Sequence, residues 1–116
     1  MALALNQFQT IAQSCPSSDT EIYEAPIGYI GVVLLAQVTN IGITSSYGVS
    51  LSHRREVGGL DVDTRMLLNY PIPAGETANL LTGKLVLESG DGIVISSTDS
   101  TQTEMNVVIS ILETLN

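Results

Sequence analysis

The sequence predicts an all-β protein: a single antiparallel β-sandwich of about seven to eight strands, jelly-roll or immunoglobulin-like in topology. The 116 residues are 44% hydrophobic but only 4% aromatic, and tryptophan is absent, so valine, isoleucine and leucine must build the core. Branched side chains of this kind favour β-strands. Clusters of Gly, Pro, Ser and Asp recur about every ten residues, which is typical of sandwiches and barrels. No stretch has a convincing helical periodicity.

Proline marks the ends of the first two expected strands. Residues 8–15 alternate loosely in polarity and stop at Pro16, and residues 21–24 stop at Ala25-Pro26. Residues 32–39 follow as an almost continuous apolar run. We expect this run to be a central strand that is buried on both faces, or buried on one face and covered by another subunit on the other.

The next strand, residues 43–52, has the most regular alternation. Its odd positions are Ile43, Ser45, Tyr47, Val49 and Leu51. Its even positions carry small, mostly hydroxyl-bearing side chains, and we expect that face to be solvated or to lie flat on another protein. The basic segment 53–55 then ends the strand, and residues 57–63 are interpreted as a loop because of Gly58-Gly59.

Further turns organise the second half of the chain. We expect a strand over residues 64–70, and Pro71 and Pro73, which cannot donate ladder hydrogen bonds, push its end towards an edge or a turn. Residues 78–87 form a strand interrupted at Gly83-Lys84. Beyond the strong turn at 88–92, we expect strands at 93–95 and 105–112, the latter with its odd positions facing inward.

Composition narrows the possible partners. The formal charge of −8, with four basic and twelve acidic residues, disfavours binding to phosphate backbones. The longest apolar run, residues 27–38, is too short to cross a bilayer, so we expect neither nucleic-acid nor membrane partners. Charged residues are only 14% of the chain, against roughly 25% in typical soluble domains. We therefore expect part of the surface to be covered by other subunits.

The sequence offers little for catalysis or cofactors. The only histidine, His53, with Ser52 beside it, lacks the glycine pattern of a nucleophile elbow, and we expect no enzyme activity and no cofactor. The single cysteine, Cys15, is expected to be a small buried hydrophobe. The pairs Asp61/Asp63 and Glu88/Asp91 supply too few oxygens for a calcium shell, so turn capping is favoured, although cation binding by either pair remains open.

Three turn motifs resemble those of a known group of proteins. They are Tyr23-Glu24-Ala25-Pro26-Ile27-Gly28-Tyr29, Tyr70-Pro71-Ile72-Pro73-Ala74-Gly75-Glu76-Thr77 and Gly83-Lys84-Leu85-Val86-Leu87-Glu88-Ser89-Gly90-Asp91-Gly92-Ile93-Val94-Ile95. The stretch 23–112 that contains them resembles small β-sandwich virion proteins of tailed bacteriophages, found among tail, baseplate, neck and capsid-decoration components. The longer segment 53–63 departs from the commoner pattern of these proteins. The resemblance carries no catalytic residue over to this chain.

The resemblance implies a structural protein that packs on other virion proteins and on copies of itself, in a virion assembled in the host cytoplasm. The alternative is a fibre-tip domain that binds a host receptor or glycan through residues 53–63. Our candidate interface residues are His53, Arg54, Arg55, Tyr29, Tyr47 and Leu112. We expect one domain over residues 1–116, with residues 1–7 as a flexible or partner-contacting arm.

Overall fold

The computed structural model describes residues 6–115, and this part of the chain consists of strands joined by turns and loops, without a helix. The strands are β1 (Asn6–Ser14), β2 (Thr20–Glu24), β3 (Tyr29–Asn40), β4 (Tyr47–Val57), β5 (Leu60–Ile72), β6 (Thr77–Asn79), β7 (Leu85–Leu87), β8 (Gly92–Ser97) and β9 (Met105–Leu115). Among the described residues there is accordingly no helix that could span a membrane.

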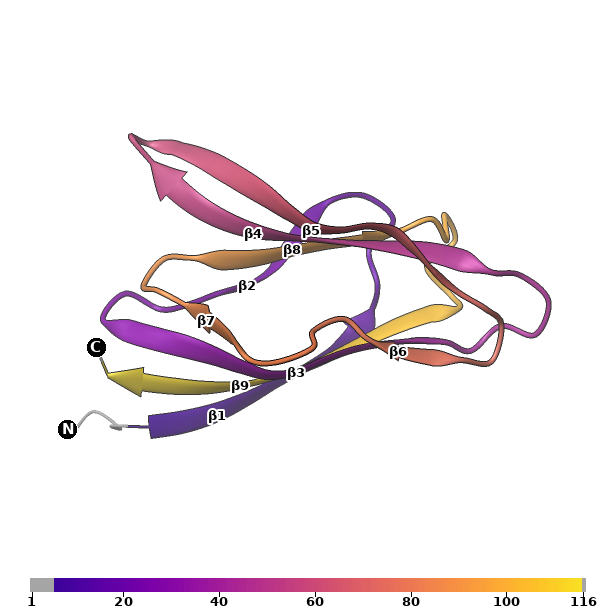
Figure 1. The fold of residues 1–116 in the computed structure, drawn as a ribbon, viewed down its shortest axis with the longest axis horizontal. Helices are drawn as coiled ribbons and strands as arrows, with labels where there is room; N and C mark the ends of the chain where they lie inside the picture. Colours follow the sequence, from indigo (N-terminus) through magenta and orange to yellow (C-terminus); the bar gives the residue numbers. More distant parts are fainter. Residues whose placement is uncertain (1–5, 116) are drawn as a thin grey trace.

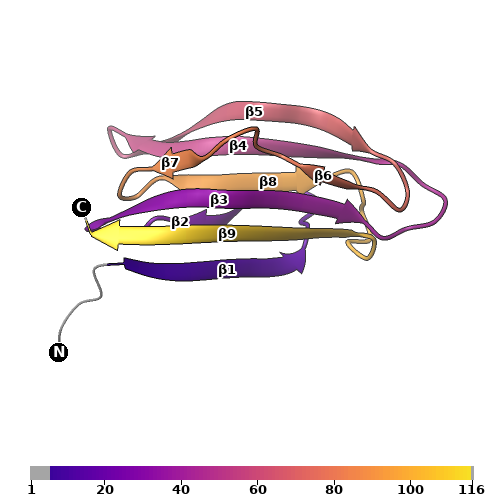
Figure 2. The same ribbon diagram turned by 60° about the horizontal axis from the view of Figure 1, so that its bottom comes forward.

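The strands form two antiparallel sheets that pack face to face (Figures 1 and 2). One has the order β1-β9-β3-β6, with β7 also paired to β3, and the other has the order β2-β8-β4-β5. Because β6 and β7 pair with different parts of the same side of β3, they act as one interrupted strand, as the break at Gly83-Lys84 predicted. The predicted β-sandwich is confirmed.

The topology decides between the two expected architectures. When β6 and β7 are taken as one interrupted strand, consecutive strands alternate between the sheets except at β4 and β5, which form a hairpin within one sheet. With β6 and β7 counted as one position, the eight positions have the strand order of a jelly roll. An immunoglobulin-like sandwich would keep several consecutive strands in the same sheet, and that alternative is therefore wrong.

The core lies between β8 and β9, which occupy central positions in their sheets. On β9 the side chains of Met105, Val107, Ile109 and Ile111 are fully buried while the even positions are only partly so, as the alternation predicted. Cys15 is also buried and has no disulfide partner, and burial raises the pKa of its thiol to about 11. The expectation of an unreactive core cysteine is consistent with this environment.

Strand β3 is central in its sheet but is buried on one face only. Val33, Ala36 and Val38 enter the core, whereas Leu34 and Leu35 are exposed next to a register shift against β9. The first of our two expectations, burial on both faces, is therefore wrong. The second expectation, that another subunit covers the exposed apolar side chains on the outer face of β3, stays a prediction.

The predicted start of β4 is also wrong. The strand begins at Tyr47 rather than at residue 43, and Ile43 is 91% exposed. The buried amide of Asn40 accounts for this: it donates to the carbonyls of Ser45 and Ile72 and accepts from the backbone N–H of Gly42, which holds the preceding residues in a loop.

The hydroxyl-bearing face of β4 is covered rather than solvated, because Ser50 and Ser52 are buried. Arg65 on β5 reaches across β4 and β8 to Asp19, with Nη2 3.2 Å from Oδ2, and Ser96 on β8 donates to the same carboxylate. The long arginine side chain thereby lies over the small side chains of the sheet's outer face.

The loop predicted at 57–63 does not exist, since Val57 ends β4 and Leu60 begins β5. The two residues between them, Gly58 and Gly59, form a tight turn, and the strands pair on both sides of it. Of the arm expected at residues 1–7, Asn6 and Gln7 pair with β9 as the start of β1, and the other residues lie outside the described range. Contact of this segment with a partner stays a prediction.

Candidate interaction surfaces

The β4–β5 hairpin extends beyond the body of the sandwich (Figure 1). Gly58 and Gly59 both have positive φ, +61° and +83°, which is the conformation of a type I′ turn and matches the twist of the strands that it joins. The pairing of β4 with β8 ends at Arg54. The outer part of the hairpin is therefore a two-stranded ribbon with little of the sandwich behind it.

Large apolar side chains are exposed along this hairpin. They are Val57, Leu60, Val62, Met66, Leu68 and Tyr70, and Leu60 at the tip is 72% exposed. Within β5 only Leu67 and Ile72 are even partly covered. An edge strand of 13 residues with this composition is a surface that native proteins normally cover or protect with charge.

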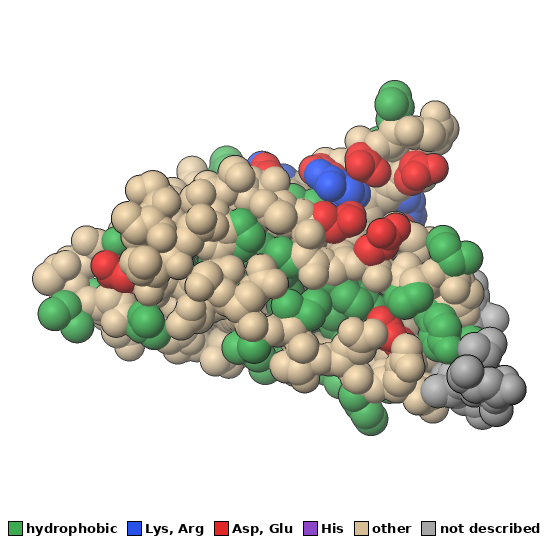
Figure 3. All heavy atoms as spheres, turned by 180° about the vertical axis from the view of Figure 1, so that it is seen from behind, with side chains coloured by type: hydrophobic (Ala, Val, Ile, Leu, Met, Phe, Trp, Pro, Cys, Tyr) green, Lys and Arg blue, Asp and Glu red, His purple; other side chains and the backbone are tan. Residues whose placement is uncertain are grey.

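One face of the outer hairpin carries the charged side chains of Arg54, Glu56, Asp61 and Asp63. The guanidinium of Arg54 donates to both carboxylate oxygens of Asp63 on the neighbouring strand, at 2.7 and 3.0 Å. This interaction lowers the pKa of the Asp63 carboxyl. Figure 3 shows acidic and basic side chains gathered where the hairpin leaves the body.

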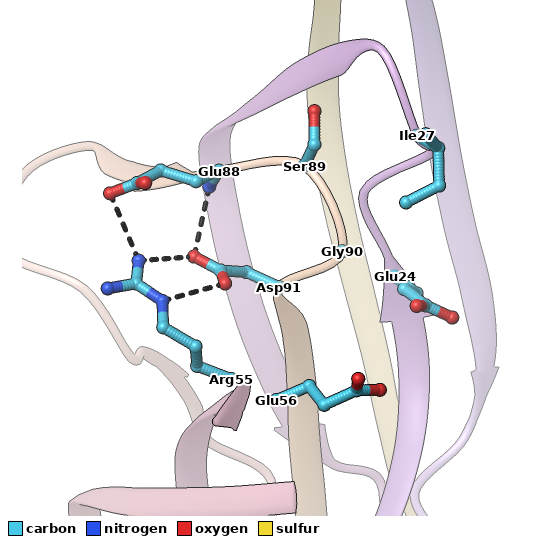
Figure 4. A pocket seen from close by; sticks show the side chains of 8 residues that line it. All are labelled: Glu24, Ile27, Arg55, Glu56, Glu88, Ser89, Gly90 and Asp91. Carbon is cyan, nitrogen blue, oxygen red and sulfur yellow. Dashed lines mark hydrogen bonds and ion pairs between the residues drawn. The ribbon is translucent and has the colours of Figure 1, made fainter. Parts of the chain in front are cut away.

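A second cluster joins the two sheets at the base of the hairpin. The buried carboxylate of Asp91, in the turn between β7 and β8, accepts from Arg55 at 2.7 and 2.9 Å (Figure 4). It lies 3.0 Å from Nε2 of His53. It also accepts from the backbone N–H of Glu88, which is the turn capping expected for this pair. The hydrogen bonds from Arg55 above all lower the pKa of Asp91 to about 2.

Next to this cluster is an open hollow of about 380 Å³. Its walls come from the end of β2, the end of β4 and the β7–β8 turn, and they include Glu24, Ile27, Arg55, Glu56 and Glu88. Glu24 and Glu56 lie on the opposite side of the hollow from the ion pair of Arg55 with Glu88 (Figure 4). The hollow is thus lined mainly by charged groups.

A buried carboxylate stabilises the other edge of the sandwich. Glu113 on β9 is fully buried and accepts hydrogen bonds from the hydroxyl of Tyr23 on β2 and from the side-chain amides of Gln7 and Gln9 on β1. Burial alone would raise the pKa of this carboxyl, but the three donors hold the pKa below its ordinary value. The contact with Tyr23 joins the two sheets.

The structure separates most of the predicted interface residues. His53 and Arg55 face inward to Asp91, whereas Arg54 faces outward to Asp63. Tyr29 and Tyr47 are half-buried at the starts of β3 and β4 and do not lie on the hairpin.

Leu112 lies on the outer face of the β1-β9-β3 sheet. It is half-buried in a row of apolar side chains that crosses the sheet, between Phe8 and Val32, with Val86 beyond. Phe8 and Val86 are exposed. The row is a second apolar surface, on the opposite side of the molecule from the outer face of the β2-β8-β4-β5 sheet.

Sequence reasoning related the end of residues 64–70 to a sheet edge, but it missed that the edge strand begins at Leu60 and exposes apolar side chains along its length. It also missed the two contacts that join distant segments, Arg65 to Asp19 and Tyr23 to Glu113. The hairpin had a local signal, since a Gly-Gly pair between strand-forming residues is typical of a two-residue turn. The long-range contacts had none, because they depend on strand order. Within residues 6–115 no group of three or more His, Cys, Asp or Glu side chains is arranged to hold a metal ion.

Comparison with known proteins gives a fold and no family. No protein-family model and no curated protein matches the sequence. Among solved structures, a chain described under "Crystal structure of the T13 IBDV viral particle reveals a missing link in icosahedral viruses evolution" is similar over 97% of this chain, with a TM-score of 0.55 and 10% identity. The similarity spans 32% of that viral chain. At this identity the similarity is one of fold alone. The strand order of the chain itself defines its class, a jelly-roll β-sandwich.

Proposed function

We propose that the chain is a non-catalytic structural protein of a virion, of the tailed-phage kind that its turn motifs resemble, and that it packs on other virion proteins. The observation that carries the proposal is the β5 edge, where apolar side chains are exposed along a long strand. Such an edge needs a neighbouring protein to cover it. The similarity in fold to part of a chain from the IBDV viral particle adds support.

The apolar row on the opposite sheet supports the same proposal. Phe8, Leu112 and Val86 give the molecule a second surface that another protein would cover, so that one copy contacts neighbours on two sides. The geometry around His53 supports the absence of catalysis. His53 bonds Asp91 on the inner face of β4, while Ser52 points to the outer face, so the two side chains cannot act as a nucleophile and its base.

Purified particles of the phage that encodes this chain provide the test. We expect quantitative mass spectrometry to find the chain at a fixed multiple of the other virion proteins, and cryo-electron microscopy to place its jelly roll in the tail, baseplate, neck or capsid surface. Absence of the chain from particles that are otherwise complete would refute the proposal.

A fibre-tip domain that binds a host receptor or glycan is the second candidate. The hollow beside Arg55 favours it, because carboxylates and a guanidinium around an open cavity can bind sugar hydroxyls. Binding of the purified chain to host cells or surface glycans would support this candidate, provided that Glu56→Ala, in the wall of the hollow, abolishes the binding. Retained binding by that variant would argue against the hollow.

A further inference from the structure

The free side of β5 is available for pairing with another strand. Within the described chain β5 pairs only with β4, so its other edge has no strand beside it. The segment Leu60–Arg65 is regular, because the register shifts against β4 begin beyond Arg65. This segment projects from the sandwich, where a second chain can approach it (Figure 1).

The turn at Gly58-Gly59 determines which backbone groups point to the free side. In a two-residue hairpin the flanking residues, Val57 and Leu60, form a hydrogen-bonded pair, and bonded and non-bonded pairs alternate from there. Asp61, Asp63 and Arg65 are therefore in non-bonded pairs with β4. Their N–H and C=O groups point away from β4, towards the free edge.

The charges on β5 select one way for two copies to pair. When two copies of a strand pair antiparallel about a two-fold axis, a residue at the axis lies opposite itself. An axis at residue 61, 63 or 65 places Asp61, Asp63 or Arg65 against its own copy, and an axis at residue 62 places Asp61 against Asp63. An axis at Thr64 places Asp63 opposite Arg65 and brings no like charges together.

We propose that two copies of this chain pair through their β5 edges, antiparallel and with the two-fold axis at Thr64. The pairing joins two four-stranded sheets into one continuous sheet. Asp63 and Arg65 of the second copy then exchange backbone hydrogen bonds, which agrees with the directions set by the turn. Thr64 forms a non-bonded pair with its own copy.

Apolar side chains flank the ionic pairs in this register. On each copy Leu60 and Val62 lie before the axis, and Met66 and Leu68 lie after it, beyond the point where the register shifts of β5 begin. All four side chains are exposed in the single chain. Asp63 and Arg65 also remain accessible, with 34% and 40% of their side chains exposed. In the dimer Arg65 exchanges its exposed contact with Asp19 for one with Asp63 of the second copy, whereas Asp63 can keep its contact with Arg54.

A cysteine at the axis tests the register directly. In a non-bonded antiparallel pair the two Cα atoms are about 4.5 Å apart, which suits a disulfide. We expect Thr64→Cys to form an intermolecular disulfide under mild oxidation at least about tenfold faster than the control Thr10→Cys, because pairing raises the effective concentration of the thiols. Thr10 is exposed on the edge strand β1, and the native Cys15 is buried. Equal rates for the two variants would overturn the proposal.

Charge variants provide an independent test if the cysteine disturbs folding. Arg65→Asp places acids opposite each other, and Asp63→Arg places arginines opposite each other, so we expect each variant alone to be a monomer by light scattering across a concentration series. A mixture of the two restores opposite charges at both positions and should form a heterodimer. Circular dichroism checks that each variant is folded. A monomeric wild-type chain, or a mixture no more associated than its components, would refute the pairing.

If the chain is a virion protein, the proposed pairing makes a second copy of the chain one of its partners. The proposal of pairing rests on the β5 edge and does not depend on the proposed virion function. Its failure in these solution experiments would leave the presence of the chain in particles untouched. Conversely, a chain that dimerises in solution and is absent from particles would contradict the proposed function alone.

Discussion

The two halves of β4 differ in burial. Residues 49–52 are buried on both faces, with Val49 and Leu51 in the core and Ser50 and Ser52 on the covered outer face, where the hydroxyl of Ser50 accepts from the backbone N–H of Asn69. Residues 55–57, on the same strand, are exposed. The difference arises because β4 continues beyond its partner β8, so that only β5 accompanies its second half. One strand thus supplies both the core and the candidate interface.

The largest expected effect comes from truncating a core side chain in the first half of β4. Leu51→Ala should lower the free energy of unfolding by about 2 to 5 kcal/mol, because it removes buried contacts and leaves a cavity. The matched control in the second half is Val57→Ala, which should change stability by less than about 0.5 kcal/mol. Urea unfolding measures both. Similar losses for the two variants would mean that the hairpin is packed as tightly as the core.

The ionic cluster at the boundary of the two halves should show an intermediate effect. Asp91→Asn removes the charge that binds Arg55 while keeping the shape of the side chain, and we expect a loss of about 2 kcal/mol because the carboxylate is buried. Asp63→Asn, which weakens an exposed pair on the hairpin, should cost less than about 1 kcal/mol. Equal losses in thermal unfolding would contradict the distinction between the two pairs.

The pH dependence of stability should come from the same carboxylate. The pKa of Asp91 is about 2 in the folded chain against an ordinary value of 3.8, so its contribution is complete above about pH 4 and disappears as the pH falls through 2. We expect the stability difference between the wild type and Asp91→Asn to shrink over that range. Urea midpoints measured between pH 2 and pH 6 check this, and a difference that stays constant would refute the assignment.

Local sequence patterns predicted most of the strands, whereas contacts between distant residues escaped them. The alternation in 105–112 placed Ile109 and Ile111 inward, and Pro71 placed β5 at an edge, because both signals act within one strand. The choice of a jelly roll over an immunoglobulin-like sandwich depends on which strands are neighbours. Glu113 and Tyr23 are 90 residues apart, so no local rule pairs them.

The hairpin was missed for a related reason. The predicted loop at 57–63 contains Gly58-Gly59 and two aspartates, which favour turns, and this composition hid the strand alternation around them. The alternation is present: Arg54 and Asp63 lie on one face, and Arg55 and Val62 lie on the other. Three adjacent residues, 53–55, were grouped as one contact site, although a strand sends neighbouring side chains to opposite faces.

Apart from the control variants, the smallest stability effect that we predict acts on the turn that creates the hairpin. Gly59 has a φ of +83° and open space around it, so Gly59→Ala meets no steric contact but must hold an unfavourable backbone conformation, at a cost of about 1 kcal/mol. Gly83→Ala, also in open space, is the control without a positive φ. Hydrogen exchange should show faster opening of the amides in the outer half of the hairpin in Gly59→Ala, and unchanged exchange in β8 and β9. Uniformly faster exchange would mean instead that the hairpin and the core unfold as one unit, and that the two halves of β4 differ in burial but not in stability.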